Sequence, residues 1–324
     1  MNTLKRTSPL ALPIENFIRL RQLCGRDYRS QGRLLGCFDR FLVQEGIKNT
    51  CITRQIIERY QSALSHLTPR DQANRICVVR QLCQYLTRND PYTFIPEPMK
   101  TIWGYRARKP YIFSCSEIRR LMEQALELPP AGSLQPHMYH TLLGLLYTTG
   151  IRISEALGLN LKSFDVSKQC LYIAQGKFRK ARWVALSDSA SKKLQHYIDQ
   201  RLNRTPNAPE DPLFLSKRDR RLYYSVAYQT FRSLLGQCDI AYHKSTGPCL
   251  HDLRHTFAMH RLLAWYQDGL NINARLPMLA TYMGHVNIRS TQVYLQPTAE
   301  LLEQVSNRFH DHYLRTIASK GGHS

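Results

Sequence analysis

The chain has 324 residues, a length that favours two domains. Hydrophobic residues make up 43% of it, which is enough for packed cores. No apolar run approaches the roughly 18 residues of a membrane-spanning helix, and the first residues lack the apolar stretch of a secretion signal. We therefore expect a cytoplasmic protein, and the net charge of +21 points to the nucleoid as its place.

The positive charge is spread along the whole chain. Residues 1–100 contain 16 basic and 8 acidic residues, and residues 101–324 contain 29 and 16. Such a distribution favours an extended polyanion as partner, and double-stranded DNA is the leading candidate. A membrane surface fits less well, because no single long helix combines a basic face with an aromatic one. A basic protein without a polyanionic partner is the plain alternative.

Four short helices are predicted in the first hundred residues, because apolar residues recur there at helical spacing. They are expected at 13–23, 32–45, 53–64 and 72–86. Thr68, in the break before the fourth helix, has the position and side chain of a helix cap. Many arginines lie along these helices, and together they suit contacts with phosphate groups, although any one of them is explained by a solvated face.

A linker is predicted after these helices. Residues 89–98 are rich in proline, and the basic run 106–110 follows. Proline-rich stretches are extended and semi-rigid. The sequence therefore predicts a helical DNA-binding domain with its linker in residues 1–104 and a second domain in residues 105–324.

The second domain is predicted to be rich in helices and to contain a small sheet. Ser114 is suited to cap a helix. Further helices are expected at 138–148, 153–159, 187–202, 223–238, 251–266, 276–283 and 299–317. Two short strands, 170–174 and 182–186, flank a basic turn. The predicted fold class is thus mainly α with a small β-sheet.

Six residues of the second domain suit phosphoryl transfer on DNA: Arg152, Lys177, His251, Arg254, His285 and Tyr294. Two arginine forks can bind the non-bridging oxygens of a phosphodiester and stabilise the charge that develops there. A free tyrosine has a pKa near 10, so a tyrosine nucleophile needs adjacent cations and a proton acceptor. A lysine in the hairpin turn can protonate the leaving alkoxide. Each residue alone has an ordinary explanation; their order and spacing carry the prediction.

Neither a metal nor another cofactor is expected. No cluster of Asp and Glu suits Mg²⁺, which argues against two-metal nuclease chemistry. His251 and His255 are spaced as in a zinc-protease helix, but the residue after the first histidine is Asp252 and not the required Glu. The nine cysteines are odd in number and contain no C-x-x-C pair, so they indicate buried thiols rather than a zinc site or a disulfide framework.

This order of residues resembles the catalytic domain of the tyrosine recombinases, also called the phage integrase family. The segment TGIRISEALGL (149–159) is similar to the family's first-arginine motif, and residues 176–186 are similar to its β-hairpin lysine motif. HDLRHTFA (251–258) resembles the second-arginine box, and GHVNIRSTQVY (284–294) resembles the block that ends in the nucleophile. The N-terminal helices resemble the family's core-binding domain by pattern only. The hairpin departs from the family in having Phe178 where Gly is common and Ala185 where Pro is common.

The resemblance implies a role for each residue. Tyr294 would attack the scissile phosphate, form a 3′-phosphotyrosyl bond and free a 5′-hydroxyl. Arg152 and Arg254 would hold the non-bridging oxygens, and Lys177 would be the general acid for the leaving oxygen.

The remaining residues would assist. His251 would help to remove the proton of the nucleophile, His285 would hydrogen-bond the phosphate, and Glu155 would orient the site rather than react. Because the covalent link conserves bond energy, rejoining would need neither ATP nor metal.

The resemblance implies a site-specific recombinase of the simple two-domain, Xer-like or transposon-borne type, acting in integration, excision or transposition of DNA. Two alternatives stay open at this stage. A type IB topoisomerase-like enzyme would relax DNA with the same nucleophile, and a non-catalytic DNA-binding partner could use the same fold.

After Tyr294, residues 297–317 form an amphipathic pattern. Its apolar positions are Leu301, Leu302, Val305, Phe309, Tyr313 and Ile317. The family implies a docking helix here, exchanged between protomers in a homotetramer or in a mixed tetramer with related recombinases. Packing on its own domain is the alternative.

Overall fold

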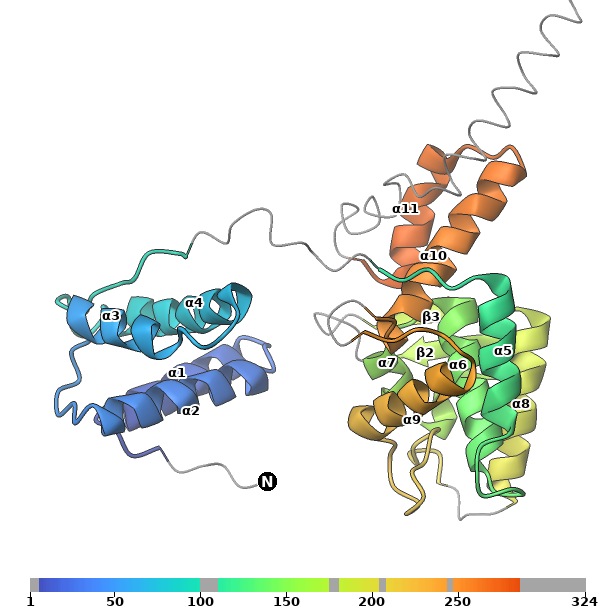
Figure 1. Ribbon diagram of the computed structural model, residues 1–324, viewed down its shortest axis with the longest axis horizontal. Helices are drawn as coiled ribbons and strands as arrows, with labels where there is room; N and C mark the ends of the chain where they lie inside the picture. Colours follow the sequence, from blue (N-terminus) through green and yellow to red (C-terminus); the bar gives the residue numbers. More distant parts are fainter. Residues whose placement is uncertain (1–5, 100–109, 175–180, 204–207, 244–246, 286–324) are drawn as a thin grey trace, which may run out of the picture. The chain divides into compact units, whose positions relative to one another are not determined.

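The computed structural model describes residues 6–99, 110–174, 181–203, 208–243 and 247–285 (Figure 1). The chain divides into two compact units, residues 1–107 and 108–324. Lys177, Tyr294 and the segment 297–317 lie outside the described residues. No helix of the described ranges is long and apolar enough to cross a membrane.

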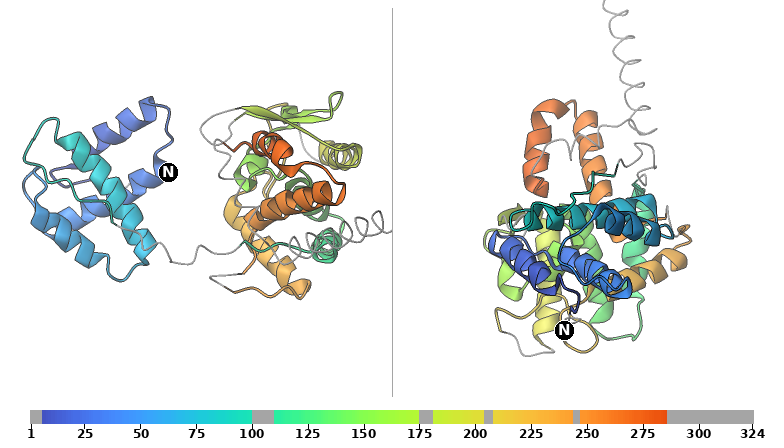
Figure 2. Two further views of the ribbon diagram at one scale, coloured as in Figure 1. Left: turned by 90° about the horizontal axis from the view of Figure 1, so that it is seen from above. Right: turned by 90° about the vertical axis from the view of Figure 1, so that its left-hand side faces the viewer.

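Residues 6–99 of the first unit form four helices in two layers, with α1 and α2 in one layer and α3 and α4 in the other (Figures 1 and 2). The helices are α1 Ala11–Leu23, α2 Arg29–Gln44, α3 Arg54–Ala63 and α4 Pro69–Leu86. Helix α4 begins three residues before the predicted start, because Pro69 occupies its first turn and the Thr68 hydroxyl accepts a hydrogen bond from the backbone N–H of Asp71. Their apolar faces meet in one core that includes Leu35, Phe38 and Leu82.

The second unit is helical around a small sheet. Its helices are α5 Cys115–Leu126, α6 Gln135–Thr149, α7 Ile153–Gly158, α8 Asp188–Leu202, α9 Tyr224–Gln237, α10 Leu250–Gln267 and α11 Ile272–Met283, with a 3-10 turn η1 at Leu161–Ser163. The strands β1 Phe164–Asp165, β2 Cys170–Ile173 and β3 Arg182–Ala185 form an antiparallel sheet in the order β1-β2-β3. The predicted fold class is confirmed. The sequence missed β1, because two residues are too few to show an alternating pattern.

Helix α6 is apolar on nearly every side and packs against α5, α8 and α10. Helices α10 and α11 run side by side as an antiparallel pair (Figures 1 and 2). Phe257, Leu262, Leu279 and Met283 form a small core between them. This packing holds α10 beside α6 and holds the C-terminal end of α11 beside α10.

Helix α11 begins at Ile272, four residues before the predicted start. The side chain of Asn271 caps it by accepting a hydrogen bond from the backbone N–H of Ala274. Pro277 lies inside the helix, and the apolar pattern on which the prediction rested becomes clear only around it. The cap, rather than the pattern, therefore sets the true start.

Candidate active site

The turn between α6 and α7 places Arg152. Gly150 ends α6 with a left-handed backbone (φ +61°), and Arg152 stands at the N-cap of α7. A Cβ at Gly150 would lie 2.3 Å from Cδ1 of Phe257 on α10. Glycine is therefore required here twice, by its backbone angle and by the closeness of α10.

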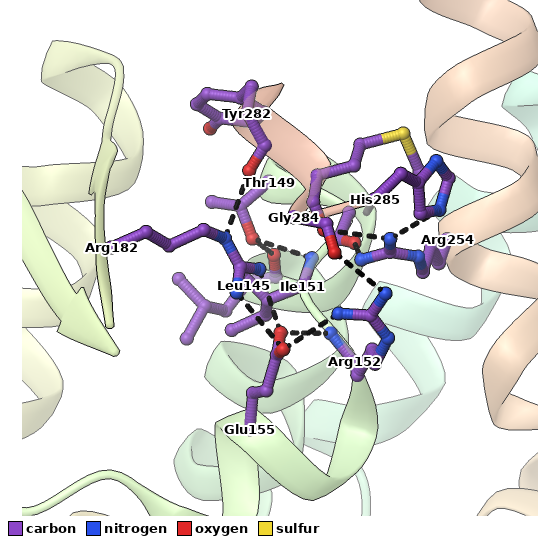
Figure 3. Close-up of polar contacts among 12 residues, drawn as sticks. Leu145, Thr149, Ile151, Arg152, Glu155, Arg182, Arg254, Tyr282, Gly284 and His285 are labelled. Atoms are coloured by element: carbon purple, nitrogen blue, oxygen red, sulfur yellow. Dashed lines mark hydrogen bonds and ion pairs between the residues drawn. The ribbon is translucent and has the colours of Figure 1, made fainter. Parts of the chain in front are cut away.

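Glu155 lies between two arginines (Figure 3). Its Oε1 accepts hydrogen bonds from Nη1 of Arg152 (2.9 Å) and Nη1 of Arg182 (3.0 Å), and its Oε2 accepts from Nη2 of Arg182 (2.8 Å). Oε2 also accepts from the backbone N–H of Arg152 at 3.0 Å. Burial would raise the pKa of Glu155, but the hydrogen bonds from Arg182 and Arg152 outweigh it and hold the pKa at about 2. Glu155 is therefore an anion at neutral pH and binds both guanidinium groups.

Arg254, on α10, is 1% exposed. Its Nη1 donates to the carbonyl oxygen of Gly150 (2.5 Å), and its Nη2 donates to the carbonyl oxygen of Met283 (2.8 Å) and to Nε2 of His285 (2.8 Å). Because a guanidinium can only donate, Nε2 of His285 accepts and carries no proton. Arg254 thus links the end of α6 to the end of α11.

The last carbonyl groups of α11 receive three different arginines. The carbonyl oxygen of Tyr282 accepts from Nε of Arg182 (3.1 Å), that of Met283 from Arg254, and that of Gly284 from Nη2 of Arg152 (3.1 Å). These carbonyls lie at the negative end of the helix dipole, where cations are stabilised. Gly284 caps the helix with a left-handed backbone (φ +68°), which turns the chain toward His285.

Two histidines border this cluster. Dehydration by the surrounding protein and the nearby Arg254 and Arg152 lower the pKa of His285 to about 4. Partial dehydration, His255 and Arg254 lower the pKa of His251 to about 4 in the same way, although the His251 side chain keeps an exposed face. Both rings are therefore neutral at physiological pH and can accept a proton.

The structure brings together four of the predicted site residues, Arg152, Glu155, Arg254 and His285, through direct hydrogen bonds and through the adjacent carbonyl groups of Met283 and Gly284. His251 lies in the first turn of α10, three residues before Arg254. Lys177 and Tyr294 lie outside the described residues.

Sequence reasoning missed one member of the cluster. Arg182 was predicted only as the first residue of a strand, yet it donates to Glu155 and Tyr282. Its place in the basic hairpin marked Arg182 as a candidate site residue. Its partners could not be predicted, because they lie 27 and 100 residues away in the sequence.

The arrangement suits an anion with several oxygens. Two guanidinium groups lie beside a neutral imidazole, in a chain whose net charge is +21. Such donors bind the oxygens of a phosphodiester and stabilise the charge gained in an in-line displacement. In the part of the chain that the structure describes, no group of three or more His, Cys, Asp or Glu residues could hold a metal ion.

Comparison with known proteins places this site in a family. The model of the phage integrase family matches residues 113–301. An integrase/recombinase of Sinorhizobium fredii is 32% identical over 300 residues, which cover 91% of this chain and 95% of the relative. The tyrosine recombinase XerD of Oceanobacillus iheyensis is 31% identical over 248 residues, covering 74% of this chain and 75% of the relative.

Solved structures share the fold at low sequence identity. The Tn1549 transposon integrase in complex with transposon right end DNA has a TM-score of 0.65 at 14% identity, covering 92% of this chain and 99% of that one. The XerH recombinase bound to palindromic difH substrate has a TM-score of 0.63 at 18% identity, covering 96% and 91%. The chain belongs to the phage integrase family and is a tyrosine recombinase, an enzyme of site-specific recombination that cleaves and rejoins DNA.

Proposed function

We propose that this chain recombines DNA through a covalent 3′-phosphotyrosyl intermediate formed by Tyr294. Arg152 and Arg254 bind the non-bridging oxygens of the scissile phosphate, and Lys177 protonates the leaving 5′-oxygen. One observation carries the proposal: the guanidinium groups of Arg152 and Arg254 bind adjacent carbonyl groups, those of Gly284 and Met283, although 102 residues separate them in the sequence.

The two histidines and Glu155 complete the site. His251 is neutral at physiological pH and accepts the proton of the nucleophile. His285 hydrogen-bonds the phosphate once its ring turns from Arg254 to the substrate. Glu155 orients Arg152 and takes no proton, because its pKa lies far below neutrality.

Double-stranded DNA is the proposed substrate and partner. The net charge of +21 supplies affinity that is largely independent of sequence. The Tn1549 integrase and XerH, which share the fold, are described in complex with DNA. We assign residues 1–104 to a core-binding domain with its linker and residues 105–324 to the catalytic domain, both contacting the same duplex.

We further propose that protomers assemble on DNA through residues 297–317. A groove of about 730 Å³ lies between the end of α6, the loop after β3, α10 and α11. Its apolar lining includes Phe257, Trp265, Met278 and Leu279. The apolar stripe of residues 301–317 from a neighbouring protomer suits this lining. A tetramer of this chain, or of this chain with related recombinases, would follow.

We propose that the chain acts in the integration, excision or transposition of a DNA element. Its place would be the cytoplasm, on the nucleoid. The similarity to an integrase/recombinase over nearly the whole length supports it.

The experiment uses a DNA site with a nick next to the cleavage point, so that the cleaved fragment diffuses away and the covalent complex accumulates. Wild-type protein is expected to become linked to the 3′ end of the DNA, without metal or ATP, and Tyr294→Phe is not. Tyr223→Phe, a change of the same type at an exposed tyrosine outside the site, should retain linkage. Linkage by Tyr294→Phe, or none by the wild type on its own site, would refute the proposal.

A further inference from the structure

We propose that Arg182 is a positioning residue that holds the two-arginine site in its active geometry and maintains its positive charge. The inference rests on the roles proposed above for Arg152 and Arg254. It assigns to Arg182 contact with Glu155 and with the end of α11, and no contact with DNA.

The contacts of Arg182 are directed into the protein. Its Nη1 and Nη2 form a bidentate pair with the carboxylate of Glu155, and its Nε donates to the carbonyl oxygen of Tyr282 (Figure 3). The side chain is 13% exposed, and that of Glu155 is 2% exposed. These three hydrogen bonds join β3 to α7 and to the end of α11 through one side chain.

The charge of the cluster depends on Arg182. Arg152 and Arg182 share the carboxylate of Glu155, so these three groups together keep one positive charge, and Arg254 adds a second. Without Arg182, the formal charge of Arg152, Glu155 and Arg254 together would be +1 in place of +2. The transition state of phosphoryl transfer would then be stabilised by half of this net positive charge.

The geometry also depends on Arg182. The hydroxyl of Tyr282 donates to the carbonyl oxygen of Ala185 (2.9 Å). Tyr282 therefore contacts both ends of β3, because its own carbonyl oxygen accepts from Arg182 at the other end of the strand. A Cβ at Gly284 would lie 2.9 Å from Cζ of Arg182, which shows that the guanidinium packs directly on the backbone of Gly284. Arg182 thus fixes the segment whose carbonyl groups receive Arg152 and Arg254.

A matched control exists at the opposite end of α7. Arg221 is also partly buried, and its guanidinium donates to the carbonyl oxygens of Leu157 (2.9 Å) and Leu159 (3.1 Å) and to Oδ1 of Asn160 (2.6 Å). Like Arg182, it donates three hydrogen bonds to protein oxygens, but none of them lies in the site.

The first measurement compares Arg182→Gln, Arg182→Lys and Arg221→Gln on the nicked DNA site. We expect Arg182→Gln to slow formation of the covalent complex at saturating DNA by about 100-fold, with little change in Kd, because misplacing the groups that bind the transition state has this effect. Arg182→Lys should recover part of the rate, since it keeps the charge without the fork. Arg221→Gln should lower Tm and leave the rate of the covalent step near that of the wild type.

The second measurement changes the substrate. A methylphosphonate at the scissile position lacks one charged oxygen, so the difference between wild type and Arg182→Gln should shrink on it. A 5′-thiolate leaving group needs no proton, and the difference should persist there. If Arg182→Gln does not fold, Arg182→Lys carries both comparisons.

A wild-type rate in the Arg182 variants, an undiminished difference on the methylphosphonate, or recovery on the 5′-thiolate would overturn the inference. The last result would assign Arg182 to proton donation instead. A wild-type protein that forms no covalent complex at all would refute the proposed function and not this inference alone.

Discussion

Nη1 of Arg254 donates a 2.5 Å hydrogen bond to the carbonyl oxygen of Gly150, a residue that precedes it by 104 positions. The contact exists because Gly150 takes a left-handed conformation and has no Cβ, which allows Phe257 on the next turn of α10 to pack against it. The two arginine motifs therefore meet through the backbone of one glycine. Four predictions follow from this site and from the groove beside it.

Gly150→Ala should lower the free energy of unfolding by at least about 2 kcal/mol, because a left-handed backbone costs an L-residue about 1–2 kcal/mol and the new methyl group would overlap Phe257. Cleavage should fall as well, since the acceptor of Arg254 moves. Gly236→Ala is the control: that glycine lies in α9, and a Cβ there meets nothing within 4 Å. Urea unfolding of both variants checks this, and equal stabilities would contradict it.

Glu155→Gln should destabilise the second unit by about 3 kcal/mol, because it removes a buried carboxylate from two guanidinium groups that are largely shielded from solvent. The exposed pair of Glu210 with Lys162 provides the comparison, and Glu210→Gln should change stability by less than about 1 kcal/mol. Denaturant titration measures both. Similar small losses in the two variants would show that the buried cluster does not contribute to stability.

Acid should destabilise the fold in two steps. The pKa of His285 and of His251 is about 4 in the folded protein and near 6.5 in the unfolded chain, so the unfolded chain binds more protons between these values and stability falls as the pH drops from 6.5 to 4. The pKa of Glu155 is about 2 when folded and near 4.5 when unfolded, so a further loss follows between pH 4.5 and 2. The test measures the free energy of unfolding across this pH range in the wild type and in a His251→Asn, His285→Asn double variant. Above pH 4.5 the stability of the double variant should depend less on pH. An unchanged dependence would count against the low pKa values of the two histidines.

Phe309→Glu should prevent tetramer formation on a DNA with two target sites, because it places a charge within the apolar stripe of residues 301–317. Met278→Glu, in the groove on α11, should have the same effect from the other side. Asn307→Glu adds the same charge to the same segment away from the stripe and should leave assembly intact. Sedimentation of the protein–DNA complexes distinguishes these outcomes; tetramers of all three variants would reject the docking proposal.

Much of the fold could be predicted from local patterns. The positions of α6 and α10 follow from apolar spacing, and the caps at Thr68 and Ser114 were readable because a cap and its partner lie within three residues of each other. Four members of the polar cluster were named from their motifs, although what each does on DNA stays a prediction. The start of α11 was predicted four residues too late, because the Asn271 cap begins the helix at Ile272 even though Pro277 lies inside it.

The sequence by itself determined the family, the order of the arginine and histidine motifs and the helical character of both units. Only the tertiary structure decided that Glu155 is shared by Arg152 and Arg182 and that three consecutive carbonyl groups at the end of α11, those of Tyr282, Met283 and its cap Gly284, receive three arginines. The physical reason is that a sequence pattern reports which face of a helix is buried, whereas the partners of a guanidinium are 3 to 132 residues away and are selected by how the helices pack. The carbonyl groups at the end of a helix bind cationic side chains only when neighbouring elements place those side chains beside them.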